Sequence, residues 1–188
     1  LPIWPLPKSA YLITVPDIAM QNAGLTEIVD LDIPQSTLYL ALPGIARRDP
    51  EHMSAMVLNH ILGGGSFTSR FWSEVREKRG LAYSVWSSLT ARRHAALFFA
   101  GTATSNERVA ESLSVMQGEI ERIAREGASA EELAKAKSYL TGSYALRFDT
   151  SRKIANQLLE ICIEGLGIDY IDRRNDEVSA VTLDSMSA

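Results

Sequence analysis

The chain has 188 residues, which suits one domain with a single hydrophobic core and is too short for two domains of ordinary size. Hydrophobic residues make up 46% and charged residues 22%, a composition that excludes the disordered, collagen-like and coiled-coil classes. Nineteen basic and 23 acidic residues give a formal net charge of −4. Because the basic residues are scattered, the chain lacks the charge pattern of a nucleic-acid-binding protein.

Proline is concentrated at the start of the chain, at positions 2, 5, 7 and 16. Proline opposes both helices and central strands, so residues 1–23 are expected to be a linker that arrives from a preceding domain. A domain is expected over residues 24–188, truncated at its C-terminus. No apolar stretch approaches the roughly 20 residues that cross a bilayer, so we expect no membrane span.

The first half of the domain is expected to alternate strands and helices. Leu38, Leu40 and Leu42 alternate with less apolar residues, as a half-buried strand requires. The expected elements are strands over 25–31 and 36–42, a helix from 49 that stops at the glycines 63–65, a helix capped by Ser66 or Thr68 that ends at Gly80, and strands over 82–90 and 94–102.

The second half is expected to be helical. Two capping-box patterns, Thr104 with Glu107 and Ser129 with Glu132, each predict the start of a helix. Further helices are expected from Ser151 to residue 165 and over 168–180, and another starts near 182, where we expect a closing element to follow. This order of elements predicts an α+β fold, an antiparallel sheet with helices packed on one face.

The histidines do not form a zinc-binding pattern. His52, His60 and His94 match neither His-Glu-x-x-His nor another tight cluster, and Cys162 is the only cysteine. A single cysteine also excludes an internal disulfide framework and leaves the compartment open between periplasm and cytosol. We therefore expect no metal site and no cofactor-binding residue in this chain.

Arg76 and Tyr83 are the candidate site residues. Arg76 falls in the last turn of an expected helix and Tyr83 just beyond Gly80, so both side chains are expected near one end of the sheet. A cation and a phenol that converge there suit a carbonyl or a carboxylate. The structural alternative is that Arg76 complements the helix dipole and Tyr83 packs with its hydroxyl at the surface.

Two sequence runs resemble the second-half domain of the insulinase-like (pitrilysin) zinc metallopeptidases, which include the mitochondrial processing peptidase. They are NHILGGGSFTSR at residues 59–70 and EVREKRGLAY at residues 74–83. Weaker similarity continues in TGSY at 141–144 and FDTSRK at 148–153, so the resemblance covers about residues 24 to 184.

This resemblance implies one half of a clamshell-shaped peptidase. In this family one half binds zinc through an inverted His-x-x-Glu-His motif and a distal Glu, and the other half supplies an Arg and a Tyr that hold the substrate backbone. Arg76 and Tyr83 match that pair in spacing and context. The zinc motif is absent here, so the resemblance implies a chain that is inactive alone, with zinc held by a partner half domain or subunit and with a peptide as substrate.

Two alternatives remain beside the peptidase. In the core subunits of a respiratory complex the same fold serves mainly as a scaffold, and the presence of both Arg76 and Tyr83 favours the peptidase over that role. A free-standing peptide-binding module is disfavoured by the expected linker and the expected truncation. Substrate, compartment and oligomeric state lie beyond what the fold implies.

Overall fold

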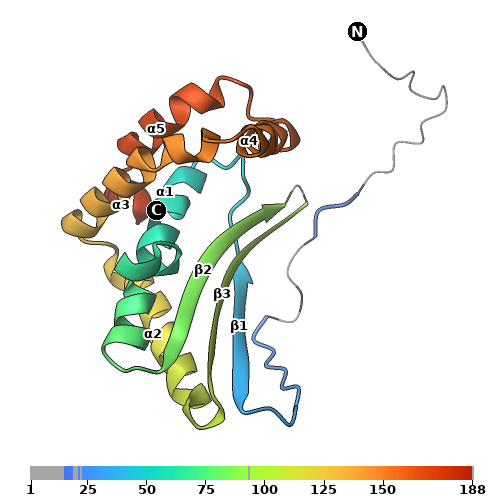
Figure 1. Ribbon diagram of the computed structural model, residues 1–188, viewed down its shortest axis with the longest axis vertical. Coiled ribbons are helices and arrows are strands. Elements are labelled where there is room, and N and C mark those ends of the chain that lie inside the picture. The colour runs from blue at the N-terminus through green and yellow to red at the C-terminus, as the bar shows by residue number, and fades with distance from the viewer. Residues whose placement is uncertain (1–14, 19–20, 22, 93, 188) are drawn as a thin grey trace, which may run out of the picture.

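The computed structural model describes residues 15–18, 21, 23–92 and 94–187. Three strands form an antiparallel sheet in the order β1-β3-β2. The strands are β1 (Gln35–Pro43), β2 (Ala82–Arg92) and β3 (Ala95–Ser105). The helices lie on one face of this sheet (Figure 1), which confirms the α+β fold expected from the order of elements.

The prediction of a strand over residues 25–31 is wrong. These residues form no strand, and their apolar side chains are exposed. β1 instead pairs with β3, which starts more than 50 residues later, with Leu38 opposite Thr102 and Tyr39 opposite Gly101. The alternation within a strand shows which of its side chains are buried, but it does not identify the partner strand. Residues 25–31 and 36–42 are neighbours in the sequence, but they do not pair as two strands.

The first helix is α1 (His52–Asn59), and it continues as a π-helical turn from His60 to Gly64. The glycines at its end were expected as a simple stop signal, but they also allow close packing. A Cβ on Gly63 would lie 2.5 Å from Ser87 Oγ and 2.6 Å from a ring carbon of Phe71. Only a residue without a side chain lets this turn approach β2 so closely.

The helical segment after the glycines is π-helical from Trp72 to Glu77 and follows a 3₁₀ turn at Ser66–Thr68. We expected Ser66 or Thr68 to cap its N-terminus, and neither residue does so. Ser69 takes this role, since its hydroxyl accepts a hydrogen bond of 3.3 Å from the Trp72 N–H. Ser69 lies within three residues of both predicted caps, but it was not among the caps expected from the sequence.

The four remaining helices are α2 (Val109–Glu126), α3 (Ala130–Gly142), α4 (Ser151–Glu164) and α5 (Tyr170–Ala180). The capping box of Ser129 and Glu132 is confirmed at the start of α3. The one expected at Thr104 is wrong, because its hydroxyl donates instead to the Leu81 carbonyl at 2.6 Å. A 3₁₀ turn from Asn106 to Arg108 leads into α2.

The core lies between the sheet and the helices. Its largest fully buried apolar side chains are Val57, Phe71, Val75, Met116 and Val178, which come from four segments: α1, the helical segment 70–77, α2 and α5. Within the described part of the chain, no helix combines the length and hydropathy needed to span a bilayer. Most of residues 1–23, the expected linker, lie outside the described residues, so that expectation stays a prediction.

Candidate functional site

Arg76 and Tyr83 lie on either side of a tight turn between the π-helical segment and β2. Gly80 occupies this turn with φ +58°, a conformation that glycine adopts without steric strain. The turn is closed by hydrogen bonds from the Gly80 N–H to the Arg76 carbonyl (2.9 Å) and from the Leu81 N–H to the Val75 carbonyl (2.9 Å). The backbone therefore returns on itself and brings two residues seven positions apart to the same spot.

The Arg76 guanidinium is held between two aromatic rings. Its central carbon lies 3.9 Å from the centre of the Trp72 ring and 4.5 Å from the centre of the Tyr83 ring. Phe67 extends the group, with an edge-on contact of 4.5 Å between its ring centre and that of Trp72. Each such cation-π contact contributes about 0.5–1 kcal/mol at an exposed site. Arg76 is therefore oriented by its neighbours.

The polar edges of this group face solvent. Tyr83 is 82% exposed and Arg76 is half-buried. A guanidinium that contacts rings through its face keeps its N–H donors at its edge, where they are available to an acceptor. The arrangement can therefore offer several donors to a carbonyl or carboxylate that approaches from outside.

Glu74 engages the other cations of the same segment. Its carboxylate pairs with Lys78 at 2.5 Å and with Arg79 at 2.6 Å. The hydrogen bond from Lys78 and the contact with Arg79 lower the pKa of Glu74 despite its burial. Glu74 thus compensates two neighbouring charges and leaves the Arg76 guanidinium to the aromatic rings.

The structure brings both predicted site residues together, but it does not test their role. Sequence reasoning missed Trp72 and Phe67, which complete the group. Trp72 precedes Arg76 by four residues, a spacing at which helical side chains meet, and this was the available signal.

The described residues do not fit a zinc ion. Among them, no group of three or more His, Cys, Asp or Glu side chains is arranged to hold a metal. His52 and His60 are buried, and burial lowers the pKa of each. His94 lies near β3 with its Nδ1 3.0 Å from an Asp17 carboxylate oxygen.

Comparison with known proteins supports the resemblance noted in the sequence. The family model of the peptidase M16 inactive domain matches residues 14–140. An uncharacterized zinc protease of Streptomyces coelicolor is 32% identical over 172 residues, which are 90% of this chain and 37% of that protein. The resemblance to a zinc metallopeptidase half domain is therefore confirmed.

Solved structures agree with the fold. The crystal structure of a peptidase M16 inactive domain from Pseudomonas fluorescens matches with a TM-score of 0.76 and 32% identity, over 82% of this chain and 36% of that one. Complex III of Candida albicans matches with a TM-score of 0.72 over 84% of this chain and 40% of that one, but at 16% identity this shows the fold alone. The chain spans little more than a third of the length of its first relatives.

Proposed function

We propose, since the chain belongs to the peptidase M16 inactive-domain family, that it is the non-catalytic half of a zinc metallopeptidase and binds the peptide substrate through Arg76 and Tyr83. Relatives of this chain are named zinc proteases, which supports a hydrolase as the whole protein. The observation that carries the proposal is the pair itself, with Tyr83 exposed and the half-buried Arg76 fixed between Trp72 and Tyr83.

The two side chains act as hydrogen-bond donors in this proposal. The Tyr83 hydroxyl and the Arg76 N–H groups donate to carbonyl oxygens of the substrate backbone, or to the oxyanion that develops when the scissile carbonyl is attacked. Donors that are already oriented stabilise such a charge without reorganisation during the reaction. The contacts of Arg76 with two rings provide that orientation.

The zinc is proposed to lie on a partner half domain or subunit of the same family, because the described residues of this chain do not fit it. The reacting peptide then lies between the two halves in a closed chamber. Closure brings the donors of this chain to the substrate and excludes bulk water, so opening and closing can limit turnover. The contribution of this chain is to bind and orient the peptide.

Kinetics of the intact protein on a peptide substrate test the proposal. Tyr83→Phe removes one exposed hydroxyl, so folding stays intact, while kcat falls by about 10²-fold if that hydroxyl serves the transition state. Arg76→Lys keeps the charge but loses the planar donors, and it should also reduce kcat/KM. Tyr139→Phe is the matched control, because Tyr139 is another exposed tyrosine, stacked on His60 and not on Arg76.

Unchanged kcat and KM in Tyr83→Phe would contradict the proposal. Arg76 and Tyr83 would then have only the structural roles of complementing the helix end and packing at the surface. The scaffold role considered for this fold would become the better explanation.

A further inference from the structure

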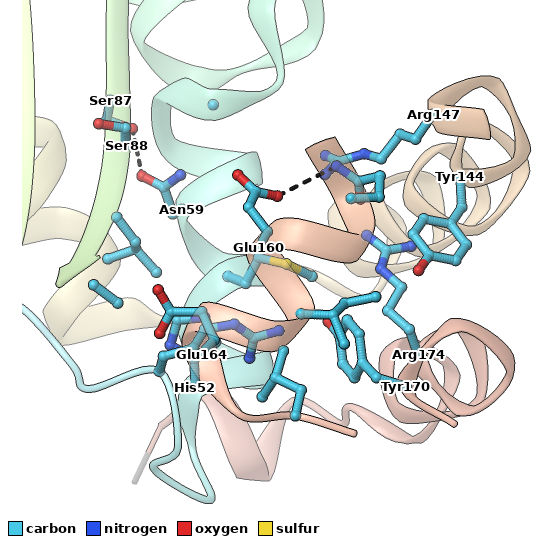
Figure 2. A pocket seen from close by; sticks show the side chains of 18 residues that line it. His52, Asn59, Ser87, Ser88, Tyr144, Arg147, Glu160, Glu164, Tyr170 and Arg174 are labelled. Atoms are coloured by element: carbon cyan, nitrogen blue, oxygen red, sulfur yellow. Dashed lines mark hydrogen bonds between the residues drawn. The ribbon is translucent and has the colours of Figure 1, made fainter. Parts of the chain in front are cut away.

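A second polar region lies away from Arg76 and Tyr83. It is a cavity of about 420 Å³ between α1, β2, α4 and the segments around α5 (Figure 2). Its charged side chains include three arginines and two glutamates, namely Arg47, Arg147, Arg174, Glu160 and Glu164. Neither Arg76 nor Tyr83 lines it.

Arg174 is the most deeply buried of these charges, with only 3% of its surface exposed. It donates to the Leu140 carbonyl at 2.6 Å and to Asn175 Oδ1 at 3.0 Å, and its guanidinium carbon lies 4.5 Å from the centre of the Tyr144 ring. These partners are neutral, and no ion pair joins Arg174 to another described residue. A buried charge without a counter-charge is costly, so this site favours an anion.

The surroundings of Arg174 supply no compensating charge. Burial lowers the pKa of Arg174, and the positive charge of Arg147 acts in the same direction. The phenols of Tyr170 and Tyr144 act in the opposite direction without carrying a counter-charge. Figure 2 shows Glu164 on the opposite side of the cavity from Arg174. Glu164 therefore does not neutralise this end of the cavity.

Tyr144 adds an unused donor at the same end. It is 7% exposed, and its buried hydroxyl has no hydrogen-bond partner among the described residues. Burial raises the pKa of Tyr144, so the phenol stays protonated and can donate. Orphaned buried polar atoms of this kind indicate a missing partner.

We propose that this cavity binds the carboxylate of a small, partly apolar ligand, with the Tyr144 hydroxyl and the buried Arg174 guanidinium at the carboxylate. A planar guanidinium and a phenol match the geometry of a carboxylate. Met56, Leu89 and Ile161 also line the cavity and suit an apolar body. Glu160 and Glu164 on the remaining wall repel ligands with several negative charges, which disfavours polyphosphates. The site is independent of the function proposed for Arg76 and Tyr83.

Calorimetric titration of the intact protein with N-acetyl-leucine tests the assignment. N-acetyl-leucine amide is the matched probe without a carboxylate, and we expect it to bind at least tenfold more weakly. Inorganic phosphate is the probe for a site that accepts any anion, and it should also bind more weakly. If N-acetyl-leucine does not bind at millimolar concentration, the proposal is wrong. This outcome is also the one expected if another part of the polypeptide fills the cavity. Equal binding of acid and amide would also overturn it.

Variants then locate the binding. Tyr144→Phe removes a hydroxyl that has no partner in the described chain, so it should fold normally and weaken N-acetyl-leucine binding by about tenfold. Arg174→Lys should weaken it at least as much. Arg173→Lys is the matched control, because Arg173 is the neighbouring arginine on α5 and is paired with Asp169 and Glu177. Tyr83→Phe should also leave binding unchanged. Binding that depends on Tyr83 and not on Tyr144 would overturn the proposal and assign the probe to the other site.

Discussion

Arg70 and Glu132 form a bidentate ion pair, with Arg70 Nε 2.7 Å from Glu132 Oε1 and Nη2 2.8 Å from Oε2. The same Nη2 donates to the Gly127 carbonyl at 3.0 Å, and Glu132 also accepts the Ser129 N–H of its capping box at 2.8 Å. This ion pair thus connects the segment that carries Trp72 and Arg76 to the end of α2, through Arg70, and to the start of α3, through Glu132. The ion pair therefore helps to hold the segment of the candidate site against the helices.

Replacement of Glu132 should destabilise the protein. Glu132→Gln keeps the size of the side chain and its capping contact but removes the charge that pairs with Arg70. Because Arg70 is largely buried and Glu132 only partly so, we expect the unfolding free energy to fall by about 1–2 kcal/mol after allowance for solvent screening. Urea unfolding measures the difference. Glu131→Gln is the matched control, since Glu131 is fully exposed and should change stability little. Equal stability of the Glu132→Gln variant and wild type would contradict the role of the pair.

The same pair predicts a dependence of stability on pH. The hydrogen bond from Arg70 lowers the pKa of Glu132 from its usual 4.5 to about 2. Because the folded pKa is below the unfolded one, the stabilisation is fully present above pH 4.5 and is lost as the pH falls towards 2. The stability difference between wild type and Glu132→Gln should therefore shrink over this range. Glu119, whose pKa is raised by burial, contributes the opposite slope and is present in both proteins. A difference that stays constant down to pH 2 would show that the charge of Glu132 is not responsible.

Gly63 should not tolerate a side chain. In Gly63→Ala the new Cβ would meet Ser87 and Phe71 at 2.5 and 2.6 Å, and it would also lie 2.8 Å from the Ser87 backbone nitrogen. We expect a loss of about 1–3 kcal/mol in unfolding free energy, typical of an overpacked core. Gly118→Ala is the matched control, because nothing lies within 4 Å of its Cβ position in α2. There alanine should stabilise the helix by up to about 1 kcal/mol. If Gly63→Ala stabilises the protein as Gly118→Ala does, then the structure around Gly63 can move to make room for a methyl group, and the prediction is wrong.

Local signals predicted the helices well and the sheet only in part. The Ser129 capping box and the helix end at Gly127 depend on neighbouring residues, so their pattern is visible in the sequence. The pairing of β1 with β3 depends on residues about 60 positions apart, and no local pattern encodes it. π-Helical turns were also missed, because their apolar spacing is hard to distinguish from that of an α-helix.

The candidate site shows the same limit. The spacing of Arg76 and Tyr83 across Gly80 was readable because a single turn separates them. The cavity around Arg174 could not be predicted in this way, since the residues that line it are spread along the chain from Arg47 to Arg174. A buried arginine looks like any surface arginine in the sequence, and only its burial beside Tyr144 marks it as unusual.

Trp72 should affect the peptidase activity of the intact protein by orienting Arg76, without contacting the scissile bond. Its ring lies against the guanidinium, with 3.9 Å between ring centre and guanidinium carbon, so Trp72→Leu would release Arg76 from one side. We expect kcat/KM of the intact protein on a peptide substrate to fall by about tenfold, in line with the loss of one cation-π contact and of orientation. Trp72→Phe keeps an aromatic face and should recover most of the activity. Thermal unfolding of both variants separates this effect from a loss of folding, because Trp72 is only partly buried. If Trp72→Leu and Trp72→Phe are equally active, or if both lose activity in proportion to stability, then Trp72 does not position Arg76.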